Sequence, residues 1–445
     1  MHRLIAQYLV YYPVQYLRGQ RVWNYLNKLR ENQYLPLDDI FGIRDRKLMD
    51  IIHHSSHNVP YYKKRFKKSG ITPGMIRGFD DLVYIPVLSK RDILENEKEL
   101  IDMQSTRNAY TRKTSGSTGM TLHFRKEGQA LAINDAIMYR CYSWNGIHIG
   151  DKQARFWGVP VSSYLKNKEL IKDLILNRIR ISAFDISEAS CIDQYRRIER
   201  FRPAYFYGYT TAIYGFCLYA RKSGIDLKKL GLKAVICTAE KMYPHHVELF
   251  NEVFDCPVVD EYGSSENGII AFQCREGNMH MMADHLCIEF LDENNERVKP
   301  GEPGKIVITD LDAYEMPLIR YEIGDIGRYT EKRCSCGINL PLMEIVEGRK
   351  EDFIRTQRGK LIHAAYLCYT LKDDAVYEFK MYQQKLDRFL VQIVKSHLFN
   401  EDTQRKLENN LRSALGEGVM INFEYLERIP REVSGKLRYF VSEID

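Results

Sequence analysis

The sequence lacks the marks of a membrane-spanning or secreted protein. Its first apolar run, residues 4–13, is broken by Gln7 and Pro13, is too short to cross a bilayer and is followed by no small-residue cleavage site. The 10 cysteines are mostly scattered singly, whereas a small secreted scaffold carries a dense cysteine framework. We therefore expect a protein of the reducing cytoplasm.

An excess of charge of either sign is also lacking. The 65 Lys and Arg residues and the 59 Asp and Glu residues leave a net charge of only +6 over 445 residues, which does not call for a nucleic-acid partner and would not hinder an anionic substrate. A hydrophobic content of 44% with 28% charged residues excludes a disordered chain. No low-complexity stretch or internal repeat is visible, and the length predicts one large body with at least one satellite domain.

Residues 1–30 allow two interpretations. They mix tyrosine, leucine and Trp23 with basic residues. Such a segment fits a helix on a membrane surface or a helix that packs on the body of the protein, and we favour the second interpretation. The basic residues include Arg18, Arg21, Lys28 and Arg30.

The middle of the chain has the pattern of a parallel sheet. Short strand-like runs at residues 204–208, 234–238 and 257–260 alternate with helix-length segments across residues 105–330. This alternation is typical of βαβ units. We therefore expect an α/β body with mainly parallel sheets flanked by helices, whose ligands bind at the carboxyl ends of the strands.

The last hundred residues have a different pattern. Residues 377–382 and 389–394 predict a strand pair, an amphipathic helix follows and stops at Gly416, and residues 419–423 predict another strand. These elements predict a small α+β C-terminal domain whose border with the body lies near residues 348–352. The apolar face of the helix consists of Leu407, Leu411 and Leu415.

A loop rich in glycine and hydroxyl groups lies before the strand-like run at residues 204–208 of the predicted parallel sheet. Its two glycines let the backbone approach an anion, and its hydroxyl and amide groups can surround phosphate oxygens. It is not a Walker loop, because it lacks a Gly-Lys-Ser/Thr ending and because residues 120–125 alternate like a strand where a Walker loop opens a helix. By itself the segment is a phosphate loop or an ordinary turn. It consists of Thr114, Ser115, Gly116, Ser117, Thr118 and Gly119.

Two further segments offer carboxylates. In residues 260–266, Tyr262 offers a flat face for a base and Glu266 offers a hard oxygen ligand for Mg²⁺. In residues 317–328, the carboxylate of Asp325 suits a bidentate grip on ribose hydroxyls. The alternatives are a polar turn for the first segment and a surface salt bridge for the second.

Five segments in this order carry a family resemblance. To the three above the chain adds residues 348–354 at the domain border and residues 434–438, whose lysine would by itself be an ordinary solvated one. Together they resemble the motifs of the adenylate-forming superfamily of acyl-CoA synthetases, peptide-synthetase adenylation domains and luciferases. The resemblance is closest to the phenylacetate–coenzyme A ligase branch, including relatives found in capsule polysaccharide clusters, and it covers nearly the whole chain.

The resemblance implies a nucleotide site. Tyr262 would stack on the adenine of ATP, and Asp325 would bind the ribose hydroxyls with help from Arg349. The other residues beside the nucleotide would be Gly263, Ala239 and Glu240.

The resemblance also implies catalytic roles. The loop Thr114–Gly119 would close over the ATP phosphates. Ser265 would contact the α-phosphate or the substrate carboxylate, and Glu266 would hold Mg²⁺. Lys436 would stabilise the adenylation transition state, and Glu351 would be the hinge of a mobile small domain.

The domain organisation follows from the resemblance, with two departures from the family pattern. Residues 1–349 would form the large ATP- and acid-binding domain and residues 350–445 the small mobile domain. Superfamily members often carry a Pro-Lys pair after the phosphate loop, where this chain has Met120 and Thr121, as in the phenylacetate ligase branch. The small domain also begins unusually, at residues 355–363, which leaves the acceptor open.

Four residues have the composition of a zinc site. A tight Cys-x-Cys pair and an earlier cysteine and histidine supply three thiolates and one imidazole, a closed tetrahedral set for structural Zn²⁺. They are Cys274, His280, Cys334 and Cys336. Some phenylacetate-ligase-like proteins have a metal at matching positions, and the alternative is a set of ordinary reduced cysteines. His285 and Cys287 are weaker candidates nearby.

These observations predict an ATP-dependent, AMP-forming ligase that uses Mg²⁺ and activates a carboxylic acid as an acyl-adenylate. The acceptor would be coenzyme A, or an amine, sugar or carrier in polysaccharide biosynthesis. Residues 207–209 and Tyr214 either line the acyl pocket or belong to the core. The alternatives from other classes are a non-catalytic nucleotide-binding scaffold of the same fold and a P-loop kinase or ATPase. The acid and the oligomeric state have no motif that would identify them.

Overall fold

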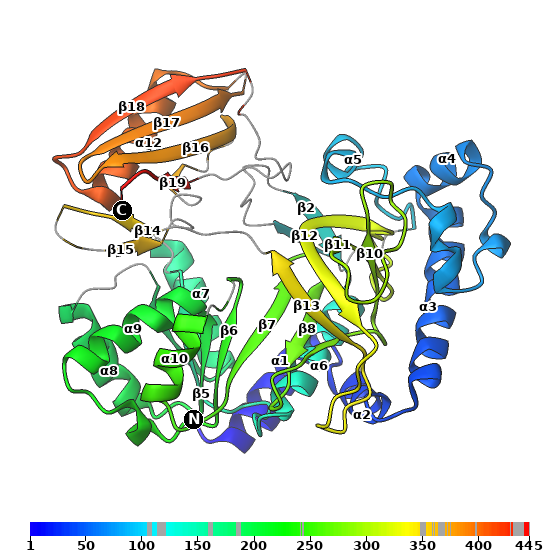
Figure 1. The fold of residues 1–445 in the computed structure, drawn as a ribbon, viewed down its shortest axis with the longest axis horizontal. Coiled ribbons are helices and arrows are strands. Elements are labelled where there is room, and N and C mark those ends of the chain that lie inside the picture. Colours follow the sequence, from blue (N-terminus) through cyan, green and yellow to red (C-terminus); the bar gives the residue numbers. More distant parts are fainter. Residues whose placement is uncertain are drawn as a thin grey trace.

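One large mixed sheet organises most of the chain, and an α+β unit follows it (Figure 1). The sheet has 11 strands in the order β10-β11-β12-β13-β9-β8-β7-β6-β5-β3-β4. The prediction of an α/β body with flanking helices and a separate α+β unit is confirmed. The computed structural model describes residues 1–104, 109–113, 122–158, 163–183, 188–240, 242, 244–347, 353–357, 359, 361–363, 370–371, 373, 375–396, 398–427, 429 and 440–444.

Five strands at one side of the sheet run parallel. Helices connect them, as the alternating pattern predicts for βαβ units, and cover this part of the sheet (Figure 1). The strands are β3 (Gln153–Trp157), β4 (Arg178–Ser182), β5 (Tyr205–Tyr209), β6 (Ala234–Thr238) and β7 (Val258–Ser264). The connecting helices are α7 (Ser163–Ile175), α8 (Glu188–Phe201), α9 (Thr210–Lys222) with the short η4 (Leu227–Leu230), and α10 (Pro244–Val253).

From β7 onward the sheet is antiparallel, so parallel pairing is confined to fewer than half of its strands. The reason is the length of the connections, because short turns can join only antiparallel neighbours. Only residues 265–267 separate β7 from the next strand. The strands of this part are β8 (Gly268–Gln273), β9 (Met279–Met281), β10 (Leu286–Leu291), β11 (Gly304–Asp310), β12 (Tyr321–Thr330) and β13 (Leu342–Glu347).

Helices of the first 143 residues pack around this sheet. Helix α2 contacts α6, and α6 contacts β8, so the N-terminal helices are joined to the body through α6. Within the part of the chain that the structure describes, no helix has both the length and the apolar character needed to cross a membrane. The elements are η1 (Ile5–Tyr11), α1 (Tyr12–Leu17), α2 (Trp23–Asn32), α3 (Leu37–Asn58), α4 (Pro60–Lys68), η2 (Pro73–Met75), η3 (Phe79–Tyr84), α5 (Lys90–Glu95) and α6 (Gly128–Ser143).

The C-terminal unit is drawn in orange and red at the top of Figure 1. Its four-stranded sheet has the order β18-β17-β16-β19, and the apolar face of α12 is buried through Leu407, Leu411 and Leu415 as predicted. The proposed border at residues 348–352 lies outside the described residues, so the domain limits stay a prediction. The elements are β14 (Phe353–Arg355), β15 (Leu361–His363), β16 (Val376–Lys385), β17 (Arg388–Lys395), α12 (Glu401–Leu415), β18 (Met420–Tyr425) and β19 (Phe440–Ser442).

A buried ion pair fixes the start of β12. Arg320 is 2% exposed, and its Nε and Nη2 donate to the two carboxylate oxygens of Glu289 on β10 at 2.9 and 3.0 Å. Its Nη1 donates to the carbonyl of Ile85 at 2.5 Å, and its own carbonyl accepts from Leu88 N at 2.8 Å. Arg320 therefore ties β12 both to the sheet and to the N-terminal region.

The first prediction concerns this pair. Arg320→Met removes the guanidinium and its two hydrogen bonds to Glu289. Among the described residues, the buried Glu289 carboxylate then has only one cation nearby, Arg297, whose Nε lies 3.5 Å away. We expect the free energy of unfolding to fall by about 3 kcal/mol, because an incompletely paired buried charge is costly. Denaturant unfolding measures the change. The matched control is Arg328→Met in the exposed pair Arg328–Glu344, which should cost less than about 1 kcal/mol. Equal losses in the two variants would contradict the anchoring role of Arg320.

Candidate active site

The predicted adenine loop follows the carboxyl end of β6. Ala239 is exposed and adopts a left-handed backbone conformation with φ of 68°. Glu240 is buried, and its backbone carbonyl accepts a hydrogen bond from Thr210 Oγ1 at 3.2 Å. Because β6 pairs with β7 so that Thr238 lies opposite Glu261, this loop comes to lie beside the next predicted segment.

Residues 260–266 are strand rather than turn over most of their length. Strand β7 continues to Ser264 because it pairs with β8, and the pairing shifts by one residue between Tyr262 and Gly263. A Cβ atom at Gly263 would lie 2.5 Å from the carbonyl oxygen of Gly268, so the strands can approach this closely only with glycine there. Ser265 follows in the turn and is exposed.

Asp325 lies in a wide bulge of β12. Between two paired positions, β12 has three residues, 323–325, where β11 has only Ile306. Gly324 has φ of 87°, a conformation that side chains disfavour. A bulge of this kind turns a side chain out of the regular alternation, and here it turns Asp325.

The two bulges meet. Tyr262 Oη donates to Asp325 Oδ2 at 2.9 Å, although β8, β9 and β13 separate their strands in the sheet order. Close by, Tyr321 Oη lies 3.4 Å from Glu266 Oε1, and Glu266 is 9% exposed. The structure thus joins two segments that are about sixty residues apart, through Tyr262 with Asp325 and through Glu266 with Tyr321, which none of the separate sequence patterns requires.

A carboxylate and aromatic rings cover the sheet face next to this site. Glu261 accepts from Tyr142 and Tyr207, both at 3.0 Å, and burial raises its pKa. The Arg155 guanidinium lies 4.4 Å from the Trp157 ring centre and 5.0 Å from that of Tyr207. Sequence reasoning missed Arg155 and Trp157. Two features of the sequence could have found them. Arg155 and Trp157 are two residues apart, as side chains on one face of a strand are, and residues 205–209 of another strand have tyrosine at every second position.

The predicted acyl-pocket tyrosines divide between two environments. Tyr207 donates its hydrogen bond to Glu261, and Tyr209 stacks on Trp157 with ring centres 4.2 Å apart. Tyr214 lies on α9, where its ring packs against His246 at 4.7 Å and against Phe250 at 6.3 Å. For Tyr214 the core interpretation is therefore the better one.

The four predicted metal ligands form one cluster. Their donor atoms all lie within 4.8 Å of one another. Cys274 Sγ and Cys334 Sγ are 3.6 Å apart, and Cys336 Sγ is 3.3 Å from His280 Nε2. His280 Nδ1 donates to the carbonyl of Leu340 at 2.8 Å, which leaves Nε2 to face the thiols. Three thiols and a correctly turned imidazole fit a tetrahedral Zn²⁺ site.

The two weaker metal candidates lie elsewhere. His285 is buried, and its Nδ1 is 2.6 Å from Asp312 Oδ2 in a network that includes Lys47. Cys287 is buried in the apolar core of the sheet. Neither belongs to the cluster found among the described residues.

Several predicted site residues lie outside the described residues: Thr114, Ser115, Gly116, Ser117, Thr118, Gly119, Arg349, Glu351 and Lys436. The strands on either side of the first group are described. β1 (Tyr110–Lys113) pairs with β2 (His123–Lys126), and Lys126 Nζ lies 2.6 Å from Asp310 Oδ2 in a buried pair. The base of this hairpin is therefore held at the end of β11, next to the strand that carries Asp325.

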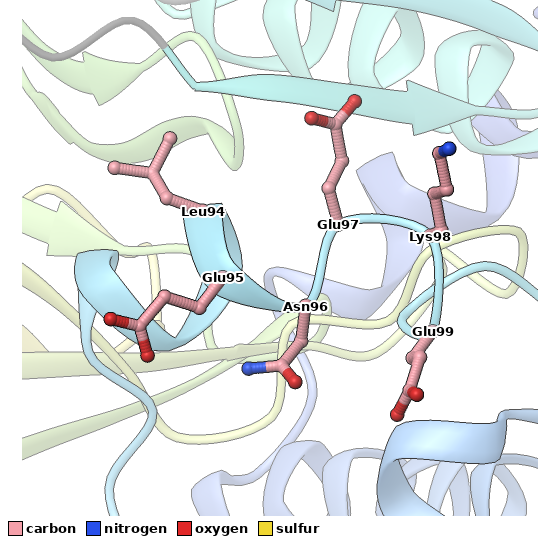
Figure 2. A pocket seen from close by; sticks show the side chains of 6 residues that line it. All are labelled: Leu94, Glu95, Asn96, Glu97, Lys98 and Glu99. Atoms are coloured by element: carbon pink, nitrogen blue, oxygen red, sulfur yellow. The ribbon is translucent and has the colours of Figure 1, made fainter.

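An open hollow of about 340 Å³ lies beside α5. Figure 2 shows its six consecutive lining residues, Leu94–Glu99, with side chains that point in different directions instead of converging. Two of its carboxylates already have partners, since Glu99 pairs with Lys64 at 2.7 Å and Glu97 lies 3.9 Å from the His123 ring. The hollow does not have the geometry of a ligand site.

Comparisons with known proteins match two families. Residues 184–311 match the AMP-binding enzyme family, and residues 354–443 match the CapK C-terminal domain. The chain is 22% identical to protein CapK of Staphylococcus aureus over 94% of this chain and 92% of the relative. It is 23% identical to a phenylacetate-coenzyme A ligase of Thermus thermophilus over 73% of each chain.

A solved structure has the same fold. It is a 2-hydroxyisobutyryl-CoA ligase in complex with 2-HIB-AMP and CoA in the thioesterification state, with a TM-score of 0.63 and 19% identity over 92% of this chain and 91% of that one. A second structure of the same ligase, in an open conformation, has a TM-score of 0.59 and covers 92% of this chain and 93% of that one at 18% identity.

The second prediction concerns Asp260, the third residue of β7. Burial, with Glu261 as a neighbouring charge, raises the pKa of Asp260 to about 7. Because this exceeds the ordinary value of about 3.9, the folded state holds the proton more tightly, and stability is lost as the pH rises towards 7. Asp260→Asn mimics the neutral form, so its gain in melting temperature over wild type should grow between about pH 5 and about pH 8.

Thermal unfolding at the two pH values measures this gain. Asp255→Asn, at an exposed position five residues earlier, is the control and should show no such growth. A gain for Asp260→Asn that is the same at both pH values would contradict the titration of this carboxyl.

Proposed function

Because this chain belongs to the adenylate-forming superfamily, in the branch of the phenylacetate–coenzyme A ligases and CapK, we propose that it activates a carboxylic acid with ATP. The acid attacks the α-phosphorus of ATP, pyrophosphate leaves, and the acyl-adenylate is then transferred to a thiol, for which we propose coenzyme A. A transfer to an amine, sugar or carrier is the other outcome that the experiments below distinguish.

The observation that carries the proposal is the Tyr262–Asp325 hydrogen bond of 2.9 Å. It places a flat aromatic ring and a carboxylate side by side at the carboxyl end of β7, where ligands of such sheets bind. The ring stacks on adenine, and the carboxylate accepts from the ribose hydroxyls. The loop at Ala239 and Glu240 borders the same place through the pairing of β6 with β7.

Charge accumulates on the phosphoryl oxygens in this reaction, so catalysis is mainly positioning and electrostatic stabilisation. We assign the phosphates to the loop Thr114–Gly119, whose flanking strands are held at Asp310. Lys436 stabilises the transition state, Arg349 supports the ribose contact, and Ser265, which is exposed next to Glu266, orients the α-phosphate or the substrate carboxylate.

Glu266 has the chemistry of a Mg²⁺ ligand. Its carboxylate offers hard oxygens. Within the described part of the chain, the side-chain contact of this carboxylate is the long one of 3.4 Å from Tyr321 Oη. Mg²⁺, when bound there, would neutralise charge on the ATP phosphates. Tyr321 keeps the carboxylate directed towards the site.

The acid binds, in this proposal, on the face formed by Arg155, Trp157 and Tyr207. These side chains are half-buried, and they lie on β3 and β5, which β6 separates from β7, the strand of Tyr262. Tyr207 reaches β7 through its hydrogen bond to Glu261. The rings favour an aromatic or polar acid over a long fatty chain. The two half-reactions need different surfaces near one site, which a small domain that turns about Glu351 supplies. Residues 1–349 and 350–445 are the proposed large and mobile domains.

The first experiment is pyrophosphate release from ATP across aryl, short acyl, amino and uronic acids, each with and without coenzyme A. Acid-dependent pyrophosphate supports the ligase, and acceleration by coenzyme A identifies the acceptor. Release of phosphate instead would indicate an ATPase. No release with any acid, together with ATP binding in calorimetry, would indicate a non-catalytic scaffold.

The third prediction concerns Lys436. Lys436→Ala should slow pyrophosphate release about a hundredfold, because a cation directed at developing charge is lost. Transfer from a chemically prepared acyl-adenylate should stay largely intact. Lys406→Ala is the control, since Lys406 lies in the same C-terminal unit and pairs with Asp373 at 2.8 Å on the surface. Equal loss of both half-reactions would contradict the assignment of Lys436.

The fourth prediction concerns the cluster of Cys274, His280, Cys334 and Cys336, which we propose as a structural Zn²⁺ site. Protein purified without chelator should contain about one zinc per chain by mass spectrometry, and Cys336→Ser should lower both the zinc content and the melting temperature. Cys256→Ser, at a half-buried cysteine outside the cluster, is the control. A zinc content near zero in the wild type would remove the proposal.

A further inference from the structure

The N-terminal helix carries its apolar side chains outwards. η1 and α1 follow one another without a break, and the inward face holds Ala6, Tyr11 and Gln15, which are at most 4% exposed. The outward face has pairs of exposed apolar residues, the second pair four residues after the first and the third eight residues after the second. These are Leu4 (45% exposed), Ile5 (47%), Tyr8 (57%), Leu9 (71%), Tyr16 (55%) and Leu17 (84%).

Polar contacts with α6 fix this orientation. Asp135 on α6 is half-buried and accepts a hydrogen bond from Tyr11 Oη at 3.0 Å and from Gln15 Nε2 at 2.8 Å with the same oxygen. Rotation of the helix to bury its leucines would break both bonds and leave the half-buried Asp135 carboxylate without these donors, which is costly. The outward leucines are therefore a stable feature of the surface.

A neighbouring helix adds a second apolar stripe. α7 packs against η1, and Asn177 just after α7 donates to the carbonyl of Met1 at 3.1 Å. On α7, Leu170, Ile171 and Leu174 are 62–68% exposed. Exposed apolar stripes on two helices that pack against each other are typical of an interaction site.

The charge around these stripes has one sign. Residues 1–30 contain five basic residues and no Asp or Glu. Arg18 and Arg21 are exposed, and the Arg21 guanidinium lies 5.3 Å from the Tyr16 ring centre. On α7, Lys172 has an exposed side chain. The acidic residues of α7 are already paired, Asp173 with Arg178 at 2.5 Å and Glu169 with Arg180.

We propose that this face, defined by η1, α1 and the outward stripe of α7, binds the surface of an anionic phospholipid bilayer. Apolar side chains enter the boundary between headgroups and acyl chains, the arginines and Lys172 contact lipid phosphates, and the tyrosines lie at the interface. The structure thus supports both interpretations of residues 1–30, because one side of the helix packs on the body and the other is free for the bilayer.

The charge also argues against a second copy of the chain as the occupant. A two-fold dimer brings the same patch of each subunit together. Arg18 and Arg21 of one copy would then face the same arginines of the other copy. Residues 1–30 contain no carboxylate that could pair with them. An anionic bilayer matches both the apolar and the basic part of the face.

The experiment is sedimentation of the full-length protein with vesicles of phosphatidylcholine that contain roughly 30 mol% phosphatidylserine, and with vesicles of phosphatidylcholine alone. We expect binding to the anionic vesicles that weakens between about 0.1 M and about 0.5 M salt. The double variant Leu9→Glu/Leu17→Glu, at the two most exposed leucines of the helix, should bind about tenfold more weakly. Arg18→Ala/Arg21→Ala should lose mainly the preference for anionic vesicles.

The matched control is Leu386→Glu/Leu398→Glu, which changes two exposed leucines of the C-terminal unit and should bind like wild type. Absence of wild-type binding to anionic vesicles would overturn the proposal. So would a dimer in analytical ultracentrifugation that Leu9→Glu/Leu17→Glu dissociates, because the face would then be a subunit interface. These outcomes do not depend on ligase activity, so they leave the proposed function to its own test.

Discussion

The bidentate pair between Arg320 and Glu289 determines where β12 begins, and the candidate site depends on that position. Tyr321 comes next in the chain and reaches Glu266, and the bulge that contains Asp325 starts two residues later. A shift of β12 by one residue would turn Tyr321 to the other face of the sheet and move Asp325 away from Tyr262. The pair is buried and both carboxylate oxygens are used, so only one register satisfies it. The specificity of the pair matters more here than its net contribution to stability.

The two bulges show why regular strands alone would not form the site. In an uninterrupted sheet, three strands lie between β7 and β12, so their residues would be four interstrand steps apart, or about 19 Å at about 4.8 Å per step. The hydrogen bond of 2.9 Å between Tyr262 and Asp325 requires that the sheet curve and that Asp325 leave the regular alternation of β12. Gly263 and Gly324 make this possible, the first through close approach of backbone and the second through its positive φ.

Local patterns in the sequence predicted local structure well. The runs at 204–208 and 234–238 and the helix that ends at Gly416 are where periodicity placed them, because the apolar pattern that identifies such elements is the same pattern that buries them. The strand continuing through Tyr262 was missed, since its partner β8 lies beyond a turn and pairing is not visible in one strand. Arg155 was missed as well, because Tyr207 comes to lie beside Arg155 and Trp157 only in the sheet. The four metal-ligand candidates were found from composition, but their convergence within 4.8 Å is a property of the fold.

The shortest strand pairing of the large sheet is the joint between β9 and β13. It explains why the cysteine–histidine cluster and the candidate site occur together. β9 and β13 are paired at only two positions, His280 with Leu342 and Met279 with Met343. Cys274 and His280 lie on one side of this joint, and Cys334 and Cys336 lie on the other. The Tyr262–Asp325 hydrogen bond spans the same joint, since β7 belongs to the first side and β12 to the second. Two paired residues give little resistance to opening, so the distance between Tyr262 and Asp325 must be maintained by something besides the ladder. A metal bound by all four ligands would hold the two sides of the joint together, whereas the Arg320–Glu289 pair fixes β12 to β10 on one side only. The metal would then be what keeps Tyr262 and Asp325 at hydrogen-bonding distance.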